Sequence, residues 1–160
     1  MTVQEMKKAA CEAIEKHAQD LIELTTAIEL EPELGYKEFK TADKVKKVLD
    51  ELGFKYQDQV AVTGIVTPVE GRDHKAKVSI MGELDAVLVP DCPTADPVTH
   101  AAHCCGHNAQ AASVVGVAYA LAETGIMKEL DGDIVLMHVP SEEFVELEYR
   151  KGLIEQGVIS

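Results

Sequence analysis

The 160-residue sequence contains no tryptophan and few other aromatic side chains, with three phenylalanines and four tyrosines making up 4% of the chain. A hydrophobic core must therefore be built mainly from Val, Ile, Leu and Ala, which account for most of the 46% of residues that are hydrophobic. A chain of this length fits one domain and is long enough to bury a sizeable core.

Basic residues are also scarce, since 15 Lys and Arg stand against 28 Asp and Glu, and the formal net charge is −13. Such a surface repels phosphate groups, so we expect no binding to nucleic acid or to an anionic membrane. No apolar run reaches the length of a transmembrane helix, and residues 1–8 lack the apolar core of a signal peptide. The expected location is the cytoplasm.

The four cysteines, Cys11, Cys92, Cys104 and Cys105, do not have the spacing of a disulfide framework. Two of them are adjacent, and a disulfide between neighbours is strained. We therefore expect reduced thiols, one of which can hold a metal ion.

Hydrophobic periodicity predicts four helices and three strands. The helices are expected over residues 3–29, 41–52, 107–123 and 144–156, and the strands over 60–67, 76–82 and 133–139. A turn at 70–73 predicts that the first two strands pair as a hairpin. The order of elements predicts an α/β fold, a layered α/β/α sandwich.

Metal-binding residue types gather just before the third predicted helix. Cys105 and His107 are good zinc ligands, and Gly106 between them allows a turn that aims both side chains at one point. The start of the helix would also lower the pKa of the Cys105 thiol. The alternative is that Cys105 is a small buried apolar residue and His107 a helix cap. We interpret His103 and Cys104 as non-ligands.

Two adjacent carboxylates, Glu142 and Glu143, follow the apolar strand predicted at 133–139. Ligands gather beyond the carboxyl ends of such strands in α/β sheets. One carboxylate can bind a metal ion while the other acts as general base toward water. The alternative is that Ser141 caps the following helix and the glutamates occupy its first turn.

The third signal is a second acidic pair, Glu83 and Asp85, which ends the strand predicted at 76–82 and points to one side by the period of two. Asp85 could orient a ligand imidazole, a common arrangement in zinc sites. The alternative is an ordinary polar strand end. The three signals together favour a metal site, because all fall at strand ends or at a helix start.

Four passages resemble motifs of the M20 family of zinc-dependent metallopeptidases and amidohydrolases, in the family's order. They are EPELGYKE at 31–38, GELDA at 82–86, HCCGHN at 103–108 and VPSEE at 139–143. Their counterparts in the family are PELG…E, Asp-x-Asp-Ala, His-Ala-Cys-Gly-His-Asp and Pro-Ala-Glu-Glu. The resemblance is strongest to the aminoacyl amidohydrolase branch and covers nearly the whole chain.

The resemblance implies a role for each matching residue. Cys105, His107 and Glu143 match metal ligands, Glu142 matches the general base that activates the attacking water, and Asp85 matches the acid that positions groups at the metal site. It also implies two divalent metal ions, Zn or Mn, and hydrolysis of the amide bond in N-acyl amino acids or small peptides.

The sequence departs from the family pattern in three residues and in length. Cys104 replaces the usual Ala, Asn108 replaces Asp, and Glu83 replaces Asp. Family members are much longer and supply, after the Glu-Glu motif, two further histidine ligands, the rest of the sheet and a lid and dimerisation domain.

We therefore expect residues 1–160 to form one partial catalytic domain, the N-terminal part of such an enzyme, without the lid and dimerisation domain. Alone it would bind at most one metal ion, show little or no activity, and associate through an exposed sheet edge into homo-oligomers. The alternative function is a non-catalytic metal-binding or interaction module. A thiol enzyme using Cys105 with His107 is disfavoured, because no third group is placed to orient the histidine.

Overall fold

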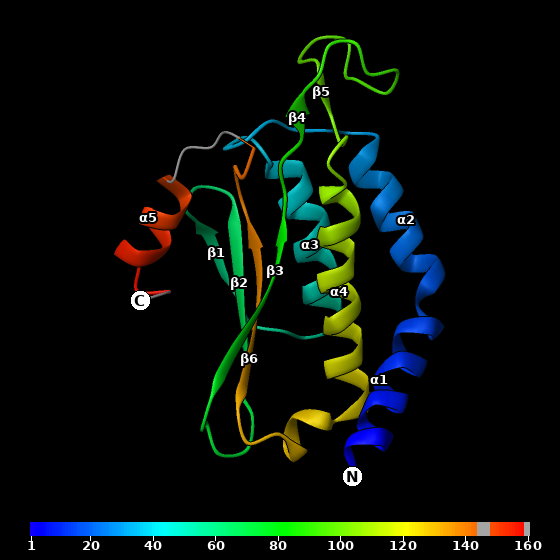
Figure 1. Ribbon diagram of the computed structural model, residues 1–160, viewed down its shortest axis with the longest axis vertical. Coiled ribbons are helices and arrows are strands. Elements are labelled where there is room, and N and C mark those ends of the chain that lie inside the picture. Colours follow the sequence, from blue (N-terminus) through cyan, green and yellow to red (C-terminus); the bar gives the residue numbers. More distant parts are fainter. Residues whose placement is uncertain (144–147, 159–160) are drawn as a thin grey trace.

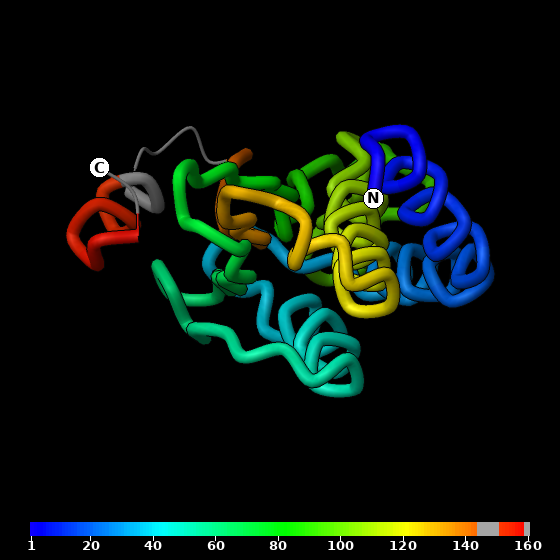
Figure 2. The backbone as a smooth tube through the Cα atoms, turned by 90° about the horizontal axis from the view of Figure 1, so that it is seen from below, coloured from blue at the N-terminus to red at the C-terminus, as the bar shows by residue number. Residues whose placement is uncertain are grey.

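The computed structural model describes residues 1–143 and 148–158, and it shows a mixed α/β fold with a partial sheet (Figure 1). Helices α1 to α4 lie on one face of the sheet and α5 on the other, as the end-on view in Figure 2 shows. The predicted layered α/β sandwich is confirmed.

In chain order, three helices are followed by five strands, then by α4 and η1, and then by strand β6 and helix α5, among the described residues. The helices are α1 (Val3–Lys16), α2 (Ala18–Glu29), α3 (Phe39–Glu51), α4 (His107–Thr124), the short 3-10 helix η1 (Ile126–Glu129) and α5 (Glu148–Glu155). The strands are β1 (Gln57–Val60), β2 (Gly64–Val69), β3 (Lys77–Glu83), β4 (Val87–Leu88), β5 (Ala101–Ala102) and β6 (Asp133–Val139).

The described strands form a four-stranded sheet in the order β1-β2-β6-β3 and a separate β4–β5 pair. Strand β6 has the bounds predicted from sequence and pairs in parallel with β3 and antiparallel with β2. The predicted β2–β3 hairpin is wrong, because β6 lies between the two strands. Residues 135–139 of β6 are all buried. A central position in the sheet removes these mostly apolar side chains from water on both faces, which an edge position would not do as fully.

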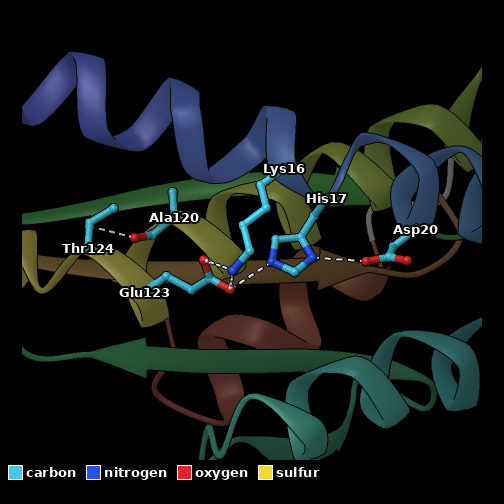
Figure 3. Close-up of polar contacts among 6 residues, drawn as sticks. All are labelled: Lys16, His17, Asp20, Ala120, Glu123 and Thr124. Atoms are coloured by element: carbon cyan, nitrogen blue, oxygen red, sulfur yellow. Dashed lines mark hydrogen bonds and ion pairs between the residues drawn. The ribbon is translucent and has the colours of Figure 1, made fainter.

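The segment 3–29, predicted as one helix, forms two helices, because the helical conformation is interrupted at His17 (Figure 3). The His17 ring stacks on Tyr119 of α4 with ring centroids 3.8 Å apart. Its Nδ1 atom lies 2.9 Å from Asp20 and its Nε2 atom 2.7 Å from Glu123. These contacts hold the α1–α2 junction against α4, which the apolar periodicity of the segment does not reveal.

The other predicted helices agree with the structure apart from their ends. Helix α3 begins two residues earlier than expected, and α4 runs to Thr124 before Gly125, whose φ of 65° ends the helix. Residues 144–147 of the last predicted helix lie outside the described residues. Periodicity did not predict β1 or the β4–β5 hairpin, which are only two to four residues long.

The main core lies between the sheet and the helices α1 to α4. Small residues of α4, including Ala111, Val115 and Ala118, are buried there and let the helix approach the sheet closely. The approach is tightest at Gly82 of β3, where an added Cβ would lie 2.9 Å from the Gln110 carbonyl oxygen. This packing sets the start of α4 beside the end of β3.

Within the described residues, no helix combines the length and the apolar character that crossing a membrane requires.

The His17 contacts predict a stability difference that depends on pH. Hydrogen bonds that His17 donates, first to the Asp20 carboxylate and then to that of Glu123, raise the pKa of the ring above its ordinary value of 6.5. A group with a raised folded-state pKa stabilises the fold fully below the unfolded-state pKa and loses this contribution as pH rises through the folded-state pKa. Urea unfolding of the natural protein and of His17→Gln should therefore show a larger loss of unfolding free energy near about pH 6 than near about pH 8.5. Parallel pH profiles would contradict the assignment.

Candidate metal centre

Three chain segments meet at one edge of the sheet and bring together most of the predicted site residues. Strand β3 ends at Glu83, and β6 runs parallel to it with Val139 opposite Glu83. The carboxyl ends of both strands therefore open onto the same place, which is where α/β sheets collect ligands. The first residue of α4, His107, lies there too, because α4 packs closely on β3.

The imidazole of His107 is the centre of this group and is buried. Its Nδ1 donates to the backbone carbonyl of Asp85 at 2.8 Å, with the Asp85 carboxylate at 3.3 Å. Its Nε2 faces three carboxylates, at 3.5 Å from Glu83, 3.8 Å from Glu142 and 3.7 Å from Glu143. Burial disfavours the charged ring, but Asp85 and then Glu83 outweigh it and raise the pKa of His107 to about 9.

Asp85 is fully buried and joins the segments of the site. One of its carboxylate oxygens accepts the backbone N–H of Glu143 at 2.9 Å, and the other lies beside the His107 ring. Burial alone would raise the pKa of this carboxyl. The hydrogen bonds from His107 and from the backbone of Glu143 and Glu142 outweigh burial, so the pKa of Asp85 is lowered and the group stays ionised.

The donor atoms fit a divalent cation. One ligand atom each of His107, Glu142 and Glu143 lie within 4.8 Å of one another. Among the described residues, a buried oxygen of Glu83 has no hydrogen-bond partner. Carboxylates brought this close repel one another unless a positive charge lies among them. Imidazole and carboxylate donors are ligands that divalent metal ions accept, so the chemistry of this group fits a metal ion.

Cys105 lies beside this group but is not one of its three members. Its side chain is exposed, so the alternative of a small buried apolar residue is wrong. The expected lowering of its thiol pKa is also wrong for the protein without metal. A hydrogen bond to the Glu143 carboxylate is the main cause that raises the pKa of the thiol to about 11. The negative charge of Glu143 therefore raises the thiol pKa by more than the start of α4 lowers it.

His103 and Cys104 are not members of the group formed by His107, Glu142 and Glu143 in the described part of the chain. Both ring nitrogens of His103 are buried, with no hydrogen-bond partner in the part of the chain that the structure describes. Burial, followed by the charge of His107, lowers the pKa of His103 to about 4, so its ring is neutral.

Gly106, before His107, has a φ of 82°, a left-handed conformation that glycine adopts at little cost.

Glu38 is a buried carboxylate that sequence reasoning did not single out. It precedes α3, is fully buried, and accepts the backbone N–H of Ser141 at 2.8 Å and the hydroxyl of Thr63 at 2.6 Å. Ser141 is also fully buried, and its φ of 58° is unusual for a residue other than glycine. Glu38 therefore holds the strained backbone from which Glu142 and Glu143 project.

This contact also bears on the alternative that Ser141 caps a helix. Glu142 and Glu143 lie in a bend and a turn, and the described part of α5 begins at Glu148. The Ser141 side-chain oxygen has no hydrogen-bond partner among the described residues. The rest of the helix turn that Ser141 would cap falls on residues 144–147, which lie outside the described residues. Residue 38 lies within the EPELGYKE passage, but its partner is 103 positions away, so only the fold reveals the pairing.

Removing the Glu38 carboxylate should weaken the fold. Glu38→Ala leaves the Ser141 N–H and the Thr63 hydroxyl unpaired beside a cavity, so we expect a loss of about 2–4 kcal/mol in unfolding free energy, measured by urea denaturation. The matched control Glu38→Gln keeps the shape and an acceptor for Ser141, and should cost no more than about 1 kcal/mol. Equal losses in the two variants would show that the hydrogen bonds do not carry the effect.

The fold and the site together define a mixed α/β domain with a site for a divalent cation at the carboxyl ends of its strands. No protein-family model matches the chain. The curated protein IAA-amino acid hydrolase ILR1-like 5 of Arabidopsis thaliana is 34% identical over 131 residues, which are 80% of this chain and 29% of that protein. Thermostable carboxypeptidase 2 of Saccharolobus solfataricus is 30% identical over 144 residues, 88% of this chain and 36% of that protein.

A solved structure supports the same assignment. A dinuclear metal-binding peptidase of the M20 family from Bacillus subtilis superposes with a TM-score of 0.77 at 26% identity, over 90% of this chain and 40% of that one. The chain belongs to the M20 family of peptidases and amidohydrolases, as the four sequence motifs predicted. It spans about a third of the length of the curated relatives that it matches.

Proposed function

We propose that this chain carries part of the active site of a metal-dependent amidohydrolase or peptidase that cleaves the amide bond of N-acyl amino acids or small peptides. The observation that carries the proposal is the convergence of Glu83, Glu142 and Glu143 on the Nε2 atom of His107. The relatives' names support the substrate class, because one is an amino acid conjugate hydrolase and another a carboxypeptidase.

In this proposal His107 and Glu143 hold the metal ion, and Cys105 joins them through its contact with Glu143. The ion, Zn²⁺ or Mn²⁺, supplies Lewis acidity and lowers the pKa of water at the site. Cys105 must stay reduced to serve as a ligand, which favours a reducing compartment such as the cytoplasm. The three-member group suits one ion, so we propose one metal in this chain and a second only where further ligands are supplied.

Glu142 is proposed as the general base. Its side chain is half-buried and lies near His107 Nε2, so it can take a proton from water and pass it to the leaving amine. Asp85 is proposed as a positioning residue. It orients the His107 ring and fixes the backbone of Glu143 through a hydrogen bond. Cleavage of the amide then gives a carboxylic acid and an amine.

Zinc titration of the purified chain by calorimetry tests the metal site. We expect one bound ion, no detectable binding by His107→Ala, and binding about 10–100-fold weaker for Asp85→Asn, because a ligand histidine loses its orienting partner. His100→Asn is the matched control, since it removes an exposed histidine outside the group. If His107→Ala binds zinc as tightly as the natural chain, the site is misassigned.

Hydrolysis is tested in the longest open reading frame that carries this sequence, with added zinc or manganese and a panel of N-acyl amino acids and dipeptides. We expect Glu142→Gln to lower kcat by about 100-fold or more while metal binding is kept, as for a lost general base. For the 160-residue chain alone we expect little or no activity.

The alternative function, a non-catalytic metal-binding or interaction module, has one observation in its favour. Strand β3 is at the edge of the described sheet and exposes Val78 and Met81 by more than half of their surface, at 57% and 59%. Such an edge can pair with another chain. A folded, metal-loaded longer protein that hydrolyses nothing in the panel, and a chain that is dimeric or larger in light scattering, would favour this alternative.

A further inference from the structure

Two thiols outside the His107 group lie in contact with each other. The Cys104 thiol donates to the Cys92 sulfur at an Sγ–Sγ distance of 3.3 Å. Cys92 is half-buried and Cys104 exposed, so small molecules can reach the pair. A disulfide requires the two sulfur atoms to approach to about 2.05 Å, a closure of little more than 1 Å from this arrangement.

The backbone around the pair brings the two thiols together. Cys92 lies in the loop between β4 and β5, and Cys104 follows β5 by two residues. The two strands pair with Val87 opposite Ala102 and Leu88 opposite Ala101. This hairpin projects from the end of the molecule, as Figure 1 shows.

Further hydrogen bonds hold the loop in the shape that presents Cys92 to Cys104. The backbone N–H of Val89 donates to the His100 carbonyl at 2.9 Å, and that of Asp96 to the Ala101 carbonyl at 2.8 Å. The Cys92 backbone N–H donates to the Val89 carbonyl at 3.1 Å. The contact between the thiols is therefore part of a bonded loop.

From this geometry we propose that Cys92 and Cys104 form a redox-sensitive modification site that a low-molecular-weight disulfide, such as oxidised glutathione, converts into an intramolecular disulfide. The inference is independent of the proposed hydrolase activity, since neither thiol belongs to the proposed metal ligands.

The chemistry balances in two exchange steps. The Cys92 thiolate attacks one sulfur of the oxidised reagent, forms a mixed disulfide and releases one thiol. The Cys104 sulfur then attacks the Cys92 sulfur, forms the Cys92–Cys104 bond and releases the second thiol. Two protein thiols are oxidised, one reagent disulfide is reduced, and the two protons pass to the two released thiols.

Cys92 is suited to be the attacking group. Its sulfur lies 3.3 Å from the Thr94 hydroxyl and accepts from Cys104, and these contacts, Thr94 first, lower the pKa of its thiol. A larger thiolate fraction at neutral pH speeds the first exchange step.

The oxidised bond would tie the hairpin loop to the segment that leads into α4. Because Cys104 directly precedes Cys105, the disulfide would restrain the backbone at the edge of the proposed metal centre. The carboxylates of that centre take no part in the bond.

Thiol mapping tests the proposal on the full chain. The reduced protein is placed in chelator at neutral pH, treated with oxidised glutathione, and alkylated. We expect two of the four thiols to resist alkylation and to become reactive again after dithiothreitol. Cleavage before aspartates separates Cys92, in residues 91–95, from Cys104, in residues 96–130, so the disulfide appears as these two peptides linked. Fragmentation of the linked species should place the bond on Cys104, with Cys105 alkylated.

Variants sharpen the outcome. Cys104→Ser should abolish the linked peptide and Cys11→Ser should leave it intact, with circular dichroism showing that both are folded. Oxidation should also raise the melting temperature of the natural chain and of Cys11→Ser but not of Cys104→Ser. A linkage that persists in Cys104→Ser, a bond between Cys104 and Cys105, stable glutathione adducts, or only intermolecular disulfides would overturn the proposal.

Discussion

The buried carboxylate of Asp85 is the contact on which the geometry of the site depends. It stands after β3, accepts the backbone N–H of Glu143 after β6, and lies against the ring of His107 at the start of α4. Asp85 thereby joins the end of β3, the segment after β6 and the start of α4, which are distant in sequence. Because the hydrogen bonds outweigh the cost of burial, the carboxylate stays charged and keeps the Nε2 atom of His107 directed at the remaining acids.

The segment that carries the two adjacent glutamates is held by its backbone, which leaves their side chains available. Glu38 accepts the N–H of Ser141, and Asp85 accepts that of Glu143. Two buried carboxylates thus fix either side of Glu142 without contacting its carboxylate. Holding a strained turn in this way allows both acidic side chains to face His107 from a backbone that would otherwise relax.

Sequence reasoning succeeded where a single segment contains its own signal. The apolar run of β6 predicted its bounds. Of the predicted site residues, the structure brings His107, Glu142 and Glu143 into one group, which does not include Cys105. Sequence reasoning failed where the answer depends on partners elsewhere in the chain. Periodicity does not tell which strands pair, so the insertion of β6 was missed. The break at His17 depends on Glu123 of α4, and the role of Glu38 depends on a backbone group 103 residues away.

The gathering of acids around one buried imidazole has a thermodynamic consequence. In a chain with a net charge of −13, Glu83, Glu142 and Glu143 face the same ring nitrogen and add to the local repulsion between negative charges. A proton on His107 offsets part of this repulsion, and the pKa of the ring is raised to about 9, by Asp85 first and then by Glu83. A divalent cation among the same donors would offset more. An ion that bound only the folded state would stabilise that state, and metal occupancy would then be linked to the stability of the fold.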